Sequence, residues 1–265
     1  MSRNFELLHE AGKVQEMLRK PAQIIRRPVD EIRSPVDEIR VPFPDAPVLP
    51  STPAIQTEGA AGEEMLKLVQ RLFLASAHGH RQIVFAGTEP GNGCSWICAH
   101  AADILASQVA GSVCVVDCDV QSPSLHLEYK VQNQFGLAEA LLGDEPIRQY
   151  MQPLSRPNLW LLSGGSANET SQQLLTSGTM RRRLSELRAE FDYVLLDVAP
   201  LSAGDQGRIL GKWCDGVALV LKENSSGRKA TRKAVENLKA AQVPVVGAVL
   251  NQRTFPIPES IYNRL

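Results

Sequence analysis

Aromatic residues are scarce in this chain of 265 residues, and neither sign of charge is in excess. Phe, Trp and Tyr together make up 5% of the residues, and 28 Lys and Arg against 29 Asp and Glu give a formal net charge of −1. A basic excess is the usual footprint of nucleic-acid binding, so this balance excludes a chain that binds nucleic acid over its whole length. The sequence also lacks a run of about 18 apolar residues, which excludes a membrane-spanning helix.

Cysteine is limited to five residues, too few for a disulfide scaffold in a chain of this length. The first residues, MSRNFELLHEAGK, have no apolar core of a signal peptide, so we expect a cytoplasmic protein. Four of the cysteines form two C-x₃-C pairs, Cys94 with Cys98 and Cys114 with Cys118. Packing in the core explains such cysteines best, because this is not a zinc spacing. A metal site and a reactive Cys94, with its pKa lowered at a helix N-terminus, are the alternatives.

The composition changes near residue 60. The first 60 residues contain 8 of the 17 prolines and only 2 of the 19 glycines. An amphipathic pattern predicts one helix over residues 3–20, and the prolines that follow predict an extended linker over 21–60. The linker contains a duplication, RPVDEIR then SPVDEIR, which is either a spacer or a docking peptide anchored by Ile32 and Ile39. We therefore divide the chain into a tail, 1–60, and a folded domain, 61–265.

From residue 61 onward, helical and strand-like segments alternate. A helix is predicted over Glu63–Leu74. The strands are predicted at Gln82–Ala86, Ser112–Val116, Leu159–Leu162, Tyr193–Leu196, Val217–Leu221 and Val245–Leu250. Continuous Val, Ile and Leu is typical of strands that are buried on both faces, and helices between such strands indicate parallel crossovers. The pattern predicts a three-layer α/β/α domain with a mostly parallel sheet.

A glycine-rich segment, AGTEPGNGCSW, follows the first predicted strand. A strand, a glycine-rich turn and a helix form the context of a phosphate-binding loop. Gly91, Asn92, Gly93, Cys94, Ser95 and Trp96 are the residues that we expect to line the nucleotide. By position, Cys94 replaces the lysine of such loops and Ser95 supplies the hydroxyl that binds magnesium. A neutral thiol cannot neutralise the outer phosphates, and Trp96 and Glu89 both crowd or repel them.

Carboxylates follow two of the later strands. Asp117 and Asp119 lie in VVDCDVQSPSLH, and Asp197 lies in YVLLDVAP. In a parallel sheet the ligand site lies at the carboxyl ends of the strands, where such carboxylates hold magnesium or orient its water ligands. ATP or ADP and Mg²⁺ are therefore the candidate cofactors, although the cysteine at the lysine position weakens the case for both.

Seven segments carry a family resemblance by their order and spacing: TEPGNGCS, VVDCDVQSPSLH, FGLAEALLGD, LWLLSGG, QQLLTSG, FDYVLLDVAPL and DGVALVLKENSSGRKATRKAVENLKAAQVPVVGAVLNQ. Over residues 61–252 the chain resembles the bacterial tyrosine kinases of capsule and exopolysaccharide production. These belong to the MinD/ParA-like group of phosphate-loop ATPases. The resemblance implies a phosphate-loop NTPase fold for the domain.

Roles for individual residues follow from this resemblance. It implies that Ser95, Asp119 and Asp197 hold magnesium, and that Asp117, with Asp119 beside it, is the catalytic base or orients a metal-bound water. It places Asn251 near the adenine. It further implies a ring-shaped homo-oligomer and a transmembrane polysaccharide co-polymerase, or chain-length regulator, as partner. That partner would hold the protein at the inner membrane.

The sequence departs from the family at several mechanistic points. Cys94 stands in place of the loop lysine, Glu89 in place of a second lysine of MinD-like relatives, and Tyr262 is alone where the family has a tyrosine-rich tail. The ring helix keeps Glu64 but has Lys67 and Gln70 in place of two arginines. Together these changes predict a pseudokinase that regulates or scaffolds exopolysaccharide or capsule biosynthesis and export.

Two other readings remain open. One is an active, atypical autokinase or ATPase of the same pathway, in which Lys222 or Arg208 replaces the loop lysine. The other is a MinD-like positioning ATPase, which is weaker because both lysines are missing.

Two basic runs lie outside these motifs. Arg181 to Arg183 at a helix start is interpreted as solvated, with contact to membrane lipid as the alternative. The cluster Arg228, Lys229, Arg232 and Lys233 is also interpreted as a solvated helix face, with an acidic partner or anionic lipid as the alternatives.

Overall fold

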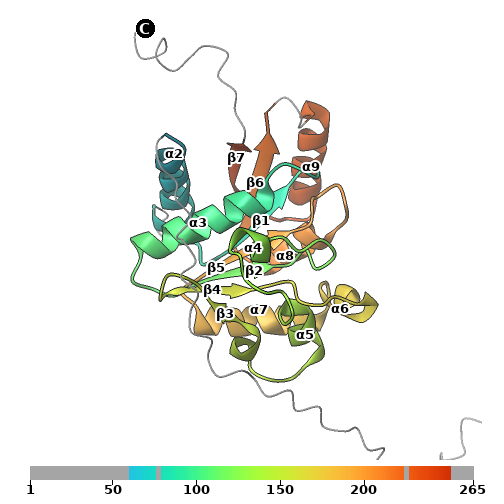
Figure 1. Ribbon diagram of the computed structural model, residues 1–265. Helices are drawn as coiled ribbons and strands as arrows, with labels where there is room; N and C mark the ends of the chain where they lie inside the picture. Colours follow the sequence, from blue (N-terminus) through green and yellow to red (C-terminus); the bar gives the residue numbers. More distant parts are fainter. Residues whose placement is uncertain (1–59, 76–78, 224–226, 252–265) are drawn as a thin grey trace, which may run out of the picture. The chain divides into compact units, whose positions relative to one another are not determined.

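The computed structural model describes residues 60–75, 79–223 and 227–251 (Figure 1). The predicted helix over 3–20, the linker with its duplication, and Tyr262 lie outside these residues. The described helices are α2 Ala60–Val69, the π-helix η1 Gln70–Leu74, α3 Cys94–Gln108, α4 Leu125–Glu128, α5 Leu137–Leu142, the 3₁₀-helix η2 Ile147–Tyr150, α6 Glu169–Leu174, α7 Gly178–Glu190, α8 Gln206–Trp213 and α9 Arg228–Ala240. The strands are β1 Gln82–Gly87, β2 Val113–Asp117, β3 Gln152–Pro153, β4 Leu159–Leu162, β5 Tyr193–Val198, β6 Gly216–Lys222 and β7 Val245–Asn251.

The strands form one seven-stranded sheet in the order β3-β4-β2-β5-β1-β6-β7. All neighbouring strands are parallel except β3, which pairs antiparallel to β4. The six predicted strands are confirmed to within two residues at each end. The seventh, β3, was not predicted because its two residues are too few to show a periodic pattern.

The central strands are mostly apolar because helices cover both faces of the sheet. Strands β1 and β2 are buried at every residue. Side chains that alternate along the strands belong to two separate cores. One core is completed by α2, α3 and α4, and the other by helices that include α5, α7, α8 and α9 (Figure 1). The three-layer α/β/α fold predicted from the sequence is confirmed.

The first described helix is interrupted near its end. A single helix was predicted over Glu63–Leu74, whereas the structure has α2 followed by a π-helical turn from Gln70. Leu72 and Phe73 in this turn are buried in the core beside α3. None of the described helices is long and apolar enough to cross a membrane.

Candidate functional site

The loop between β1 and α3 lies at the carboxyl edge of the sheet, where the motif predicted it. Gly91 and Gly93 have φ angles of 78° and 75°, which side chains of L-residues rarely adopt. Gly93 is also the N-cap of α3, and no side chain caps that helix end. The loop therefore turns through two left-handed positions directly into a helix N-terminus, which is the backbone arrangement that favours an anion.

An amide pair holds this loop from within. The Asn92 side chain is 1% exposed, and its Nδ2 donates to Thr88 Oγ1 and to the Val220 carbonyl, both at 3.0 Å. Asn251 at the end of β7 donates from Nδ2 to the Asn92 carbonyl at 2.9 Å. The amide of Asn251 also lies directly over Gly93, since a Cβ at Gly93 would come within 2.3 Å of its nitrogen. The structure thus places Asn251 against the phosphate loop, and a contact of Asn251 with adenine stays a prediction.

Cys94 and Ser95 begin α3, and their side chains lie beside the carboxyl group of Asp197. Burial of the Cys94 thiol, together with the charge of Asp197, raises its pKa well above the ordinary value. The expectation of a lowered pKa at this helix N-terminus was therefore wrong, because loss of water outweighs the helix dipole. Cys94 stays a neutral thiol where a phosphate loop normally carries an ammonium group.

The acidic residues gather at the same edge of the sheet. Asp117 pairs with Asp197 across β2 and β5, and both side chains are buried. Burial is the main cause that raises the pKa of Asp117 to about 6 and that of Asp197 to about 7. One oxygen of Asp117 accepts hydrogen bonds from the amides of Ser124 and Leu125, at 2.8 and 3.0 Å. Asp119, two residues further, lies at the rim, where its Oδ1 accepts from the Ser122 amide.

Each buried carboxylate keeps one oxygen without a partner. Oδ1 of Asp117 and Oδ1 of Asp197 are buried and accept no hydrogen bond. Within the described parts of the chain, neither they nor Asp119 form an ion pair with a lysine or arginine. Buried acceptors without donors are costly, and a bound cation or its water ligands would satisfy them. The donor set therefore fits a divalent cation better than it fits an isolated phosphate.

The side chain of Trp96, which we expected to crowd the phosphates, makes a ring contact within α3, and the expected crowding stays a prediction. Its indole stacks on the imidazole of His100 one turn later in α3, with ring centroids 3.7 Å apart. His100 is buried and its Nδ1 lies 2.8 Å from the Trp96 carbonyl. The indole is 37% exposed. The stacking thus covers one face of the indole with the imidazole of His100.

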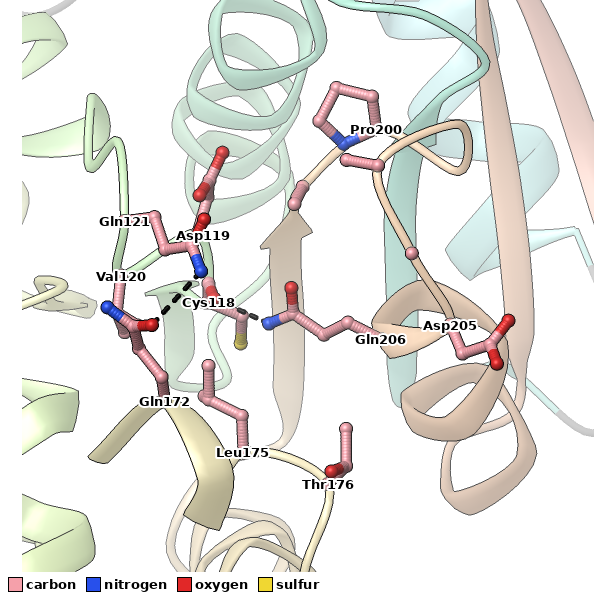
Figure 2. Close-up of a pocket in the computed structure, with 13 residues that line it drawn as sticks. Cys118, Asp119, Val120, Gln121, Gln172, Leu175, Thr176, Pro200, Asp205 and Gln206 are labelled. Atoms are coloured by element: carbon pink, nitrogen blue, oxygen red, sulfur yellow. Dashed lines mark hydrogen bonds between the residues drawn. The ribbon is translucent and has the colours of Figure 1, made fainter. Parts of the chain in front are cut away.

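A cavity of about 180 Å³ opens beside Asp119 (Figure 2). Its walls come from the loop after β2, from α6 and the turn that follows it, and from the loop between β5 and α8. Gln206 Nε2 donates to the Cys118 carbonyl at 2.5 Å, and Gln121 Nε2 donates to Gln172 Oε1 at 3.1 Å. No lysine or arginine lines this cavity. The cavity was not predicted from the sequence, because no role followed for Gln121 and Gln172, although both lie in segments that carry the family resemblance.

The two cysteine pairs do not come together. Cys98 is buried in the core beside α3, whereas Cys114 and Cys118 are buried in the core on the other face of the sheet. Among the described residues, no group of three His, Cys, Asp or Glu side chains is arranged to hold a metal ion. Cys98, Cys114 and Cys118 therefore act as packing residues of the two cores.

Two of the basic residues considered from the sequence form contacts that were not predicted for them. Arg183 was interpreted as solvated, but its side chain is fully buried. Its guanidinium donates to the carbonyls of Ala140, Gly143 and Glu145 at 2.6–2.8 Å. Arg208, a candidate replacement for the loop lysine, pairs with Asp205 at 2.7 Å.

Comparison with known proteins agrees with this geometry. Residues 80–240 match the family model described as cellulose biosynthesis protein BcsQ. The tyrosine-protein kinase YwqD of Bacillus subtilis is 28% identical over 171 residues, which are 64% of this chain and 72% of YwqD. The tyrosine-protein kinase ptk of Acinetobacter johnsonii is 28% identical over 68% of this chain, but the match spans only 24% of that relative.

Solved structures with the same fold include tyrosine kinase domains and a ParA family ATPase. The kinase domain of Escherichia coli tyrosine kinase ETK superposes with a TM-score of 0.69 at 21% identity, covering 78% of this chain and 83% of that one. A ParA family ATPase from Chlorobium tepidum has a TM-score of 0.56 at 18% identity, covering 66% and 75%. The chain therefore belongs to the cellulose biosynthesis protein BcsQ family, and it has the phosphate-loop fold of bacterial tyrosine kinases and ParA-like ATPases.

Proposed function

We propose that this protein is a degenerate member of the tyrosine-kinase-like group, a pseudokinase that regulates or scaffolds exopolysaccharide biosynthesis and export. The neutral Cys94 thiol at the lysine position of the phosphate loop, held against Asp197, carries the proposal. The family's description as a cellulose biosynthesis protein supports the choice of pathway. The partner in this proposal is a transmembrane co-polymerase, which would hold the protein at the inner membrane.

Electrostatics gives the physical reason for reduced chemistry. Asp117, Asp119 and Asp197 gather at one edge of the sheet, and the described residues provide no ion pair to balance them. ATP would add the negative charge of its β- and γ-phosphates to this edge. Catalysis of phosphoryl transfer consists mainly of positioning and of stabilising that charge. Loss of one preorganised donor at an active site costs roughly 10²–10³ in rate. Here the lost donor is the loop lysine, and no other lysine or arginine lies in residues 88–96.

Magnesium remains compatible with the residues present. The partnerless oxygens of Asp117 and Asp197 fit a cation or its water ligands, and Ser95, Asp119 and Asp197 would hold the ion. Such an ion would neutralise the outer phosphates of a nucleotide. The loop around Gly91 and Gly93 would contribute backbone amides to the same phosphates. A protein with this fold, cobyrinic acid a,c-diamide synthase from Mycobacterium smegmatis, contains an ATP analogue and magnesium. Binding without turnover is therefore part of the proposal.

A thermal-shift titration with ATP, ADP and Mg²⁺ tests the proposal on wild type and Cys94→Lys. A ligand that binds only the folded state raises the melting temperature by mass action. We expect a small shift for wild type, and a larger shift for the variant because its ammonium group restores the missing charge. Cys98→Lys is not a usable control because that residue is buried in the core. Cys94→Met is the matched control, since it changes size without adding charge.

The second candidate is an active atypical autokinase or ATPase. Burial raises the pKa of Asp117 to about 6, close to the value that suits a general base at neutral pH, and this observation favours the second candidate. Magnesium-dependent turnover of ATP that is lost in Asp117→Asn and kept in Asp144→Asn, a change at an exposed carboxylate outside the site, would establish it and would exclude the pseudokinase. Circular dichroism must accompany Asp117→Asn, because Asp117 also anchors the amides of Ser124 and Leu125.

A further inference from the structure

Helix α9 carries an unusual concentration of positive charge. Arg228, Lys229, Arg232, Lys233 and Lys239 are all exposed, and Glu236 is the only acidic residue of the helix. With one residue about every 100° of helical turn, the five cations fall within an arc of about 140°. Leu238, the one fully buried side chain of α9, points away from that arc into the core beneath the sheet. The apolar side of α9 is thus occupied by the fold, and its basic side faces outward.

Most of these cations form no ion pair with the part of the chain that the structure describes. Arg232 pairs with Glu236 at 3.0 Å, but Arg228, Lys229, Lys233 and Lys239 form no ion pair with any described residue. The charges of the helix sum to +5 − 1 = +4. The whole chain has a net charge of −1, so this density is local.

The placement of the charges opposes helix stability. Arg228 and Lys229 occupy the first turn, which has no acidic residue and no side-chain cap, and there the helix dipole disfavours cations. Arg228 with Arg232, and Lys229 with Lys233, are like charges four residues apart, which repel each other. Lys239 in the last turn and the Arg232–Glu236 pair favour the helix, but the cations of its first turn do not, and departures of this kind from local rules are expected at functional sites.

We propose that α9 is a docking surface for an anionic lipid bilayer. Long, unpaired side chains spread over about 17 Å of helix suit a fluid surface of many lipid phosphates. Recognition of an acidic peptide would instead use arginines that are fixed in bidentate geometry, and only Arg232 has a fixed partner here. The helix stays packed on the sheet, so the attachment is electrostatic and reversible. This attachment does not depend on nucleotide or on the proposed pseudokinase role.

Co-sedimentation of the full chain with vesicles tests the proposal. Wild type is expected to bind phosphatidylcholine vesicles that contain phosphatidylglycerol, to ignore pure phosphatidylcholine, and to dissociate as salt is added. The variant Arg228→Gln/Lys229→Gln/Lys233→Gln removes three cations and keeps the Arg232–Glu236 pair. Because each cation near an anionic surface contributes similarly, binding should weaken by roughly 100-fold.

A matched variant removes the same charge elsewhere. Arg71→Gln/Arg181→Gln/Lys212→Gln changes three exposed cations that also lack ion pairs with described residues, and it should bind like wild type. Equal losses in the two variants, or equal binding to neutral vesicles, would overturn the proposal. Binding of wild type to poly-glutamate but not to vesicles would also overturn the proposal, because it would identify an acidic polypeptide as the partner of α9.

Melting temperature separates docking from a structural role. Removing charges that oppose the helix should leave the melting temperature of the α9 variant unchanged or raise it, because Gln is a good helix former. A clear fall in melting temperature would show that the cations serve the fold, and would also contradict the proposal.

Discussion

Substitution of Arg183 gives the sharpest prediction about the free energy of unfolding, because the same substitution at the neighbouring Arg182 is a matched control. The Arg183 side chain is fully buried, and it makes four hydrogen bonds. Three go to the carbonyls of Ala140, Gly143 and Glu145, and the fourth goes to Glu186 Oε2 at 2.6 Å. Arg182 is 47% exposed and forms ion pairs of 3.1–3.6 Å with Glu186 and Asp144.

Arg183→Met keeps most of the volume and removes every donor. The carbonyls at and beyond the C-terminus of α5 then lose their partner inside the protein, and Glu186 loses its closest cation. Breaking a buried ion pair from one side costs about 3–5 kcal/mol, and each orphaned carbonyl adds to the penalty. For Arg182→Met we expect a loss of about 0.2–1 kcal/mol, because exposed pairs are screened by water.

Urea unfolding and thermal melts of the two variants measure the difference. At about 2–4 °C per kcal/mol for a domain of this size, Arg183→Met should lower the melting temperature by roughly 6–20 °C. Arg183→Lys should fall between wild type and Arg183→Met, because an ammonium group keeps the charge but cannot reach three carbonyls at once. If Arg183→Met and Arg182→Met differ by less than about 1 kcal/mol, the buried guanidinium does not hold α5 as we argue.

Two further predictions concern the phosphate loop and the carboxylates. In Gly91→Ala the added Cβ would meet no atom within 4 Å, so the variant should lose about 1–2 kcal/mol of folding stability from its φ of 78° alone. Ala at Gly93 should cost about 1–3 kcal/mol more, because its Cβ would lie 2.3 Å from Asn251 Nδ2. Adding Asn251→Ala to Gly93→Ala should recover that second part, and additive losses in a double-mutant cycle would contradict it. Burial raises the pKa of Asp117 to about 6 and that of Asp197 to about 7, so the folded protein keeps protons that the unfolded chain releases. Their contribution to the stability of the nucleotide-free protein is complete below about pH 4 and is lost as the pH rises through about 6 to 7. Urea midpoints across that range should therefore fall in wild type and fall less in Asp197→Asn, and the same slope in both would refute the assignment.

The sequence was sufficient wherever the signal is local. Continuous apolar runs predicted six of the seven strands, because a strand that is buried on both faces is mostly Val, Ile and Leu and keeps its few polar residues near its ends. The glycine-rich segment around Gly91 and Gly93 predicted a loop at the end of the first strand, because left-handed backbone positions require glycine. The order of Asp117 and Asp197 along the chain was enough to place both at one edge, since parallel strands end together.

Tertiary structure decided everything that depends on what a side chain meets across the fold. Cys94 could be read from the sequence as a reactive thiol, yet burial against Asp197, about 100 residues away, makes it neutral. Arg183 lies in a run of three arginines that look alike in sequence, and only the approach of α5 to α7 buries one of them. The cysteine pairs share one spacing but belong to different cores, because the sheet separates them. Local chemistry therefore fixes which elements form and where they end, whereas desolvation and long-range partners, which no spacing encodes, fix what the residues at their ends can do.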